Sequence, residues 1–135
     1  MMETIRFGVS LDAELLQDFD QLCTSQGYAN RSEALRDLMR EALESHALEH
    51  GDVAAVGVLT LAYDHHKSGL VQKLTEAQHH APIDVVATLH VHLDHDTCLE
   101  VLIMRGQGNL IREFAQKLRA IKGVAHGKLN LTEMP

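Results

Sequence analysis

The stretch IDVVATLHVHLDHDTCLEVLIMR, residues 83–105, decides the fold of the second part of this chain. Apolar side chains alternate along 83–93, and a second β-rich run occupies 97–105, as expected of two half-buried strands. The polar segment Asp94-His95-Asp96 between them is a turn signal. We therefore predict an antiparallel hairpin centred on His95.

Helical and strand periods alternate on either side of this hairpin. Together they predict the order βαββαβ for residues 51–135, as in ferredoxin-like folds. Both helices have one apolar face, so they should cover a single face of a four-stranded sheet. The predicted elements flanking the hairpin are a strand at Val53–Tyr63, a helix at about Lys67–His80, a helix at Asn109–Ile121 and a strand at Ala125–Leu131.

Residues 1–50 have a different pattern. Thr4–Ser10 alternates as a short strand, and two amphipathic helices follow, the first ending at Gly27 and the second capped by Asn30 and reaching about Gly51. One strand and two helices bury too little surface to be stable alone, and a lone strand lacks hydrogen-bond partners. We therefore expect an intertwined dimer with a two-stranded ribbon, and an α+β protein as a whole.

The composition limits the function. The chain has 135 residues, of which 45% are hydrophobic, and a net charge of -7. Without a membrane-spanning run or a secretion signal, we expect a cytoplasmic protein with no membrane partner. The negative charge disfavours bulk attraction to nucleic acid, so DNA contacts must come from a few local donors. Ten histidines instead indicate a metal-dependent or pH-dependent role.

Two histidines share a strand face with a cysteine. In the predicted register His92 lies opposite Cys98 and His90 opposite Glu100, with the two imidazoles about 6.6 Å apart along the strand. Two imidazoles and a thiolate can bind one ion, while the carboxylate holds a ring N–H. We expect this face to be the one without helices, and therefore to need a partner protein. The residues expected on the helix side are Val85, Ala87, Leu89, Val91 and Leu93.

A fourth ligand is available at the end of the preceding helix. There His79 or His80 could reach the ion, in the same subunit or a neighbouring one. A complete four-coordinate shell favours a structural or sensing role over hydrolysis, which needs an open position. Tetrahedral ligands would favour zinc and planar ones nickel(II) or copper(II), and the spacing does not distinguish them. The pair His65-His66, beside Asp64, is a candidate for a weaker second site.

The sequence resembles the nickel-responsive ribbon-helix-helix transcriptional regulators of the NikR type over essentially its whole length. The resemblance implies a homotetramer, a dimer of dimers, in which two DNA-binding heads flank a core of ACT-like domains at residues 51–135. The matching motifs are Arg6-x-Gly8-x-Ser10-Leu11, Gly27-Tyr28-Ala29-Asn30-Arg31-Ser32-Glu33-Ala34, Gln78-His79, Leu89-His90-Val91-His92 and Asp96-Thr97-Cys98-Leu99-Glu100.

The resemblance also implies a nickel site and reduces His80 to a bystander. Gln78 and Glu100 would support the ligands from behind. The implied ligands of one square-planar Ni(II) per subunit are His90, His92 and Cys98 of one subunit and His79 of a neighbour.

For DNA, the resemblance implies that the ribbon enters the major groove of an operator with palindromic half-sites. Arg6 and Ser10 would contact base edges or nearby phosphates. Gly8 departs from the family pattern, because a glycine deletes one side-chain contact and weakens the strand. The operator sequence does not follow from these residues.

The start of the second helix is the other implied DNA contact. Backbone amides at Asn30, Arg31 and Ser32 would bind a phosphate, with Arg36 assisting. The acid pair Glu33 and Asp37 matches a weaker cation site of the family.

The predicted function is nickel-responsive regulation of transcription, with repression of nickel-uptake genes as the usual family role and no enzymatic activity. One alternative is a metal-independent ribbon-helix-helix repressor or antitoxin, in which the C-terminal part only assembles subunits. Its DNA binding would not need His92 or Cys98. Another alternative is an ACT-like module that senses an amino acid, which amino acids but not metals would stabilise.

Overall fold

The computed structural model describes residues 2–135. Its contacts divide the chain into two compact units, with the division between Ala42 and Leu43 inside one long helix. This division precedes the boundary after residue 50 that the sequence predicts, because Leu48 near the end of this helix packs against the C-terminal core. Among the described residues, no helix is long and apolar enough to cross a bilayer.

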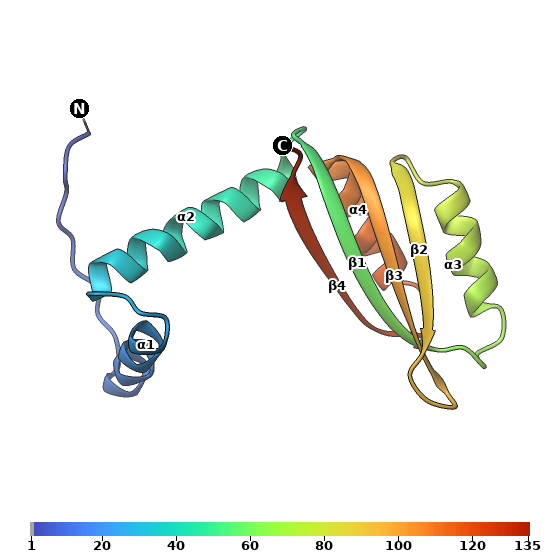
Figure 1. The fold of residues 1–135 in the computed structure, drawn as a ribbon, viewed down its shortest axis with the longest axis horizontal. Helices are drawn as coiled ribbons and strands as arrows, with labels where there is room; N and C mark the ends of the chain where they lie inside the picture. Colours follow the sequence, from blue (N-terminus) through green and yellow to red (C-terminus); the bar gives the residue numbers. More distant parts are fainter. Residues whose placement is uncertain (1) are drawn as a thin grey trace. The chain divides into compact units, whose positions relative to one another are not determined.

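The N-terminal unit contains α1 (Ala13–Ser25) and the first part of α2 (Arg31–His50) (Figure 1). Gly27 follows α1 with a φ of +78°, a left-handed conformation that ends the helix at little steric cost. The side chain of Asn30 accepts a hydrogen bond from the Glu33 amide at 2.9 Å. This bond confirms the predicted N-cap of the second helix.

The sequence predicts a strand at residues 4–10, but these residues form no strand in the single chain. An isolated strand leaves its amide and carbonyl groups without partners, so the ribbon requires a second copy. The alternating side chains Ile5, Phe7 and Val9 are 77%, 66% and 60% exposed. The apolar stripe that motivated the prediction is therefore uncovered in one chain.

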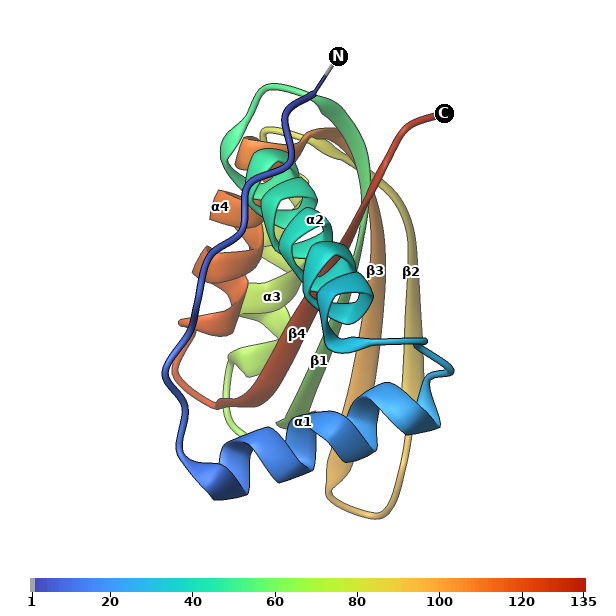
Figure 2. The same cartoon turned by 90° about the vertical axis from the view of Figure 1, so that its left-hand side faces the viewer.

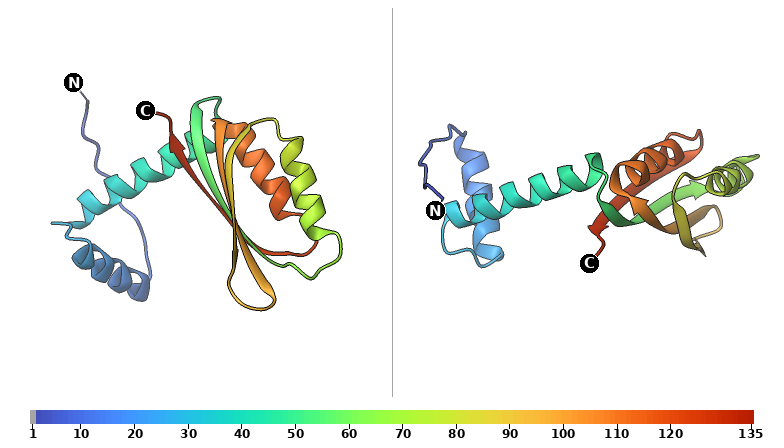
Figure 3. Two further views of the ribbon diagram at one scale, coloured as in Figure 1. Left: turned by 45° about the vertical axis from the view of Figure 1, so that its right-hand side comes forward. Right: turned by 90° about the horizontal axis from the view of Figure 1, so that it is seen from above.

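The C-terminal unit is a four-stranded antiparallel sheet in the order β2-β3-β1-β4, with both helices on one face (Figure 3). This confirms the predicted βαββαβ order and its ferredoxin-like arrangement. The elements are β1 (Ala54–Asp64), α3 (Leu70–His79), β2 (Asp84–His92), β3 (Thr97–Gln107), α4 (Gly108–Arg119) and β4 (Val124–Glu133).

The core lies between the sheet and the two helices, which Figure 2 shows on the same side of the strands. The amphipathic spacing of each helix directs one apolar face inward. The buried residues include Leu70 and Leu74 of α3, Ile111, Phe114 and Leu118 of α4, and Leu59, Leu61 and Leu102 of the sheet.

A β-bulge in β2 reverses the faces that the sequence predicts. The pairing of β2 with β3 shifts register between Val85 and Ala87, which leaves Val86 as the extra residue. Val85 packs against the core as expected, but the alternation beyond the bulge is displaced by one residue. His90 and His92 therefore lie on the helix-covered face, and the prediction that they lie on the bare face is wrong.

The bare face is apolar, with a different set of residues from the predicted one. Leu89 and Leu93, expected on the helix side, are 59% and 57% exposed. Ala87 and Val91 share their side by alternation, and Val58 and Ile103 add exposed apolar groups from the adjacent strands. The expectation that this face needs a covering partner therefore applies to these residues.

Gly108 allows α4 to begin close to the end of α2. A Cβ at this position would collide with the Leu48 carbonyl oxygen, a backbone atom that cannot rotate away. We expect Gly108→Ala to lower the free energy of unfolding by about 1–3 kcal/mol, measured by urea denaturation. Lys122→Ala is the control, since Lys122 is exposed after α4. An equal loss in both variants would contradict this packing argument.

Candidate metal centre

Two neighbouring strands place three of the predicted ligands on one face of the sheet. His92 pairs with Cys98 and His90 pairs with Glu100, which confirms the predicted hairpin register. Cys98 and Glu100 are buried under the helices, whereas the His90 side chain is 47% exposed. Because β2 is the edge strand, these residues form a cluster at the rim of the core.

His90 is the centre of this cluster. Its Nδ1 lies 4.0 Å from Cys98 Sγ and 3.5 Å from the Tyr63 hydroxyl, and its Nε2 lies 3.6 Å from a Glu100 oxygen. Metal–thiolate and metal–imidazole bonds of the size found for zinc sum to about 4.3 Å. One ion can therefore contact both Nδ1 and Sγ, and a thiolate with imidazoles suits a transition metal.

The Glu100 carboxylate is 1% exposed and joins three elements. It accepts hydrogen bonds from the Tyr63 hydroxyl at 2.9 Å and from Gln78 Nε2 at 2.7 Å. The Thr88 hydroxyl donates in turn to Gln78 Oε1 at 3.3 Å. The carboxylate thereby connects β3, β1 and the end of α3, and its burial is compensated by these donors.

Tyr63 and Thr88 are members of this network that sequence reasoning missed. Tyr63 pairs with Cys98 across β1 and β3, which only the order of strands in the sheet reveals. Burial, followed by the hydrogen bond to Glu100, raises the pKa of the Tyr63 phenol far above its usual value. Tyr63 therefore stays a hydrogen-bond donor at every pH the protein encounters. Thr88 could have been predicted as a member, because it lies two residues before His90 and therefore on the same face of the strand.

His79 and His80 lie at the exposed end of α3. His79 is the last residue of α3 and His80 its C-cap, and both are exposed. Across the described residues, one set of three ligand atoms of the metal-binding kind lies within 4.8 Å of one another, and it comprises His66, His95 and Asp96. In the described residues, therefore, neither the predicted four ligands nor the three on β2 and β3 (His90, His92 and Cys98) form such a set.

The predicted DNA contacts are exposed, and two of them have structural partners. Arg31 forms a two-pronged ion pair with Asp20 of α1, at 2.8 and 2.9 Å. This contact lowers the pKa of the Asp20 carboxyl. The side chain of Asn30 caps α2, as described above, so neither side chain is free for a phosphate. The other predicted contacts, Arg6, Gly8, Ser10, Ser32 and Arg36, are all solvent-exposed.

The acid pair Glu33 and Asp37 lies one turn apart on the exposed surface of α2. Asp37 accepts a hydrogen bond from the Tyr28 hydroxyl at 3.0 Å and pairs with Arg40 at 3.4 Å. The hydrogen bond to Asp37 raises the pKa of Tyr28. One carboxylate of the pair therefore already has partners within its own chain.

Two family models match this chain. The NikR C terminal nickel binding domain matches residues 56–132, and the ribbon-helix-helix protein of the copG family matches residues 5–45. The second match identifies the N-terminal unit, including residues 5–10, as a DNA-binding ribbon-helix-helix head that needs a second copy.

Curated relatives match nearly the whole chain. A protein of Nitratidesulfovibrio vulgaris is 55% identical over 98% of this chain and 95% of its own length. One of Geobacter sulfurreducens is 53% identical over the same shares, and one of Solidesulfovibrio magneticus is 50% identical over 97% and 94%. Each is named "Putative nickel-responsive regulator", so the relatives are regulators and not enzymes.

Among solved structures, the ACT domain of a GTP pyrophosphokinase from Chlorobium tepidum has a similar fold. The TM-score is 0.50 at 13% identity, covering 56% of this chain and 96% of that domain. At this identity the likeness concerns the fold alone, and it agrees with an ACT-like C-terminal unit. With its two domain matches and its relatives over almost the full length, the chain belongs to the NikR family of nickel-responsive ribbon-helix-helix regulators.

Proposed function

We propose that this protein represses nickel-uptake genes in the cytoplasm when nickel is bound. The observation that carries the proposal is the shared face of β2 and β3, where His90 and His92 lie opposite Glu100 and Cys98 and His90 Nδ1 is 4.0 Å from the thiol. A closed set of nitrogen and sulfur ligands suits a sensor that holds its ion, since it leaves no position for a substrate.

The ligands of one nickel(II) ion per subunit are then His90, His92 and Cys98 together with His79 from a neighbouring subunit. Supporting this division, His79 is the last residue of α3 and is exposed, so it can face a neighbouring chain. When bound, the ion supplies a strong cross-link between chains. A planar arrangement would favour nickel(II) over zinc.

The assembly is a homotetramer, built as a dimer of dimers. Two copies of residues 4–10 pair into the ribbon and cover the stripe of Ile5, Phe7 and Val9. The apolar bare face of the sheet, with Leu89 and Leu93 exposed, then packs against the same face of another subunit.

The ribbon reads the major groove of an operator with two half-sites. Arg6 and Ser10 contact base edges or phosphates, and Gly8 contributes no side chain. Because the Arg31 guanidinium is paired with Asp20, the phosphate at the start of α2 is bound by the backbone amides near Asn30, Arg31 and Ser32, with Arg36 nearby. A net charge of -7 means that both heads must bind together for useful affinity.

An additional weakly bound cation belongs beside Glu33 and Asp37. Both carboxylates are exposed and one turn apart, so a cation would reduce repulsion between an acidic head and the phosphates. The existing contacts of Asp37 with Tyr28 and Arg40 make this the weaker of the two ion sites.

Nickel binding affects the DNA-binding heads by shifting the population between two arrangements of the tetramer. Gln78 binds Glu100 from the residue before His79, so the position of α3 depends on the same carboxylate that faces His90. Fixing α3 of one subunit against β2 of another favours a head spacing that fits two half-sites. A hundredfold gain in operator affinity corresponds to about 2.7 kcal/mol of coupling.

Operator affinity in the presence and absence of nickel tests the sensor role. The probe is a duplex selected from a random-sequence pool by the nickel-loaded tetramer, and binding is measured by fluorescence anisotropy. We expect nickel to tighten binding of the natural chain and of His80→Ala, and to have no effect on His79→Ala. Equal binding by loaded and metal-free natural protein would favour a metal-independent repressor, and equal behaviour of the two variants would refute the ligand assignment.

Glu100→Gln tests the supporting carboxylate. It keeps the shape of the side chain but removes the charge that faces His90, so we expect nickel affinity to fall by about 10–100-fold, measured by competition with a chelator. Glu113→Gln, at an exposed position of α4, is the matched control. If both variants bind nickel as tightly as the natural chain, Glu100 has only a structural role.

Arg6→Ala tests the reading ribbon. Loss of one cationic contact per chain should weaken operator binding and make it less dependent on salt, measured as the slope of affinity against salt concentration. Nickel affinity should remain unchanged, because Arg6 lies far in sequence from every proposed ligand. An unaltered salt slope would show that Arg6 does not contact the DNA.

A further inference from the structure

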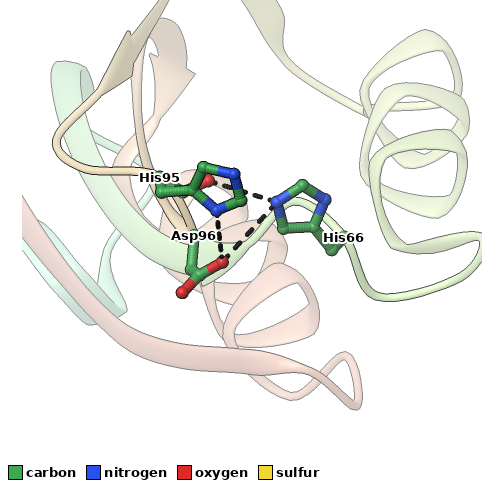
Figure 4. Close-up of side chains that lie close together, drawn as sticks. All are labelled: His66, His95 and Asp96. Carbon is green, nitrogen blue, oxygen red and sulfur yellow. Dashed lines mark hydrogen bonds and ion pairs between the residues drawn. The ribbon is translucent and has the colours of Figure 1, made fainter.

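A second group of metal-type ligands lies at the end of the sheet, outside the proposed nickel site. His66 belongs to the connection between β1 and α3, and His95 and Asp96 belong to the turn between β2 and β3 (Figure 4). Asp96 Oδ1 lies 3.0 Å from His95 Nδ1 and 3.6 Å from His66 Nε2. All three residues are exposed and can be reached directly from solvent.

The backbone around these ligands is well anchored. The Asp94 carboxylate accepts the amides of Asp96 at 2.9 Å and Thr97 at 2.7 Å, which closes the turn. The His65 amide donates to the Asp96 carbonyl at 3.3 Å and so ties the two segments together. The backbone that carries the three ligands is therefore held by hydrogen bonds that do not use their ligand atoms.

The spacing of these atoms suits a small ion. Metal–ligand bonds of about 2.0–2.1 Å in a tetrahedral arrangement place neighbouring ligand atoms about 3.4 Å apart. The two separations of 3.0 and 3.6 Å lie on either side of this value, and the shorter one is a hydrogen bond between His95 and Asp96 that an ion would replace. At present His66 Nε2 lies 3.1 Å from the His95 carbonyl oxygen, a contact that a bound ion would replace.

Within the described part of the chain, the neighbouring His65 has an unpartnered buried atom between the two groups of ligands. Its ring lies 4.1 Å from that of His66 and 5.0 Å from that of His92. Its Nδ1 is a buried atom with no hydrogen-bond partner in residues 2–135. Buried polar atoms of this kind are uncommon in proteins, and a water molecule or ion is one partner that can satisfy them.

We propose that His66, His95 and Asp96 form a second site for a divalent first-row transition ion such as nickel or zinc. Two imidazoles and one carboxylate select such ions over magnesium or calcium, which prefer oxygen ligands throughout. The site lacks a thiolate and leaves at least one position to water, so it binds more weakly than the cysteine-containing site. It is contained within one chain and does not depend on the proposed nickel sensor.

An ion there would brace the strand ends that carry the other ligands. The turn at 94–96 lies two residues from both His92 and Cys98, and His66 precedes α3, which ends at His79. Filling the second site therefore stiffens both connections to the first without sharing a ligand with it.

Nickel titration of the full-length protein tests the proposal, with bound metal measured by equilibrium dialysis and the thiolate charge-transfer band by absorption. We expect one tight equivalent per chain that produces the band, and a weaker equivalent at His66, His95 and Asp96 that does not; the all-oxygen pair Glu33 and Asp37 suits a hard cation instead. His66→Ala and Asp96→Asn should lose the weaker equivalent and keep the band. Cys98→Ala should lose the band and keep the weaker equivalent.

His126→Ala is the control, since it removes an exposed histidine from β4 and should leave both equivalents. A natural chain that binds no weaker equivalent overturns the second site, as does its retention in both His66→Ala and Asp96→Asn. A missing thiolate band in the natural chain would instead overturn the proposed sensor and leave the second site standing.

Discussion

The register of β2 against β3 is the constraint on which the candidate centre depends. A single extra residue, Val86, turns His90 and His92 toward the helices, where Cys98 and Glu100 are already buried. Without that bulge the imidazoles would lie on one side of the sheet and the cysteine on the other. Backbone pairing, more than any contact between side chains, therefore determines which groups can share an ion.

The buried Glu100 carboxylate depends on the same register and extends its effect to α3. A charged group with so little exposure is costly to bury unless its oxygens are hydrogen-bonded, and Tyr63 and Gln78 supply those bonds. The hydrogen bonds that compensate this burial link the end of α3 to the strands. Movement of the end of α3 relative to the sheet of its own chain would have to break or rearrange this network.

The chain also leaves large apolar surfaces without cover. Ile5, Phe7 and Val9 are exposed in the N-terminal unit, and Leu89 and Leu93 on the bare face of the sheet. Exposed groups in such numbers lower the stability of a monomer and favour association. Membership of a ribbon-helix-helix family explains the first surface, because this segment becomes a β-strand only when it pairs with the same segment of a second chain.

Local pattern alone determined the helices, the strands of the C-terminal unit, the N-cap at Asn30 and the hairpin register that sets His92 opposite Cys98. These features depend on neighbours in sequence, where spacing and turn chemistry are direct evidence. The bulge at Val86, the partnership of Tyr63 with Glu100 and the approach of His66 to Asp96 were decided only by the tertiary structure. They arise because strands and loops distant in sequence become neighbours, and a one-residue shift in pairing changes every face without changing the apolar pattern.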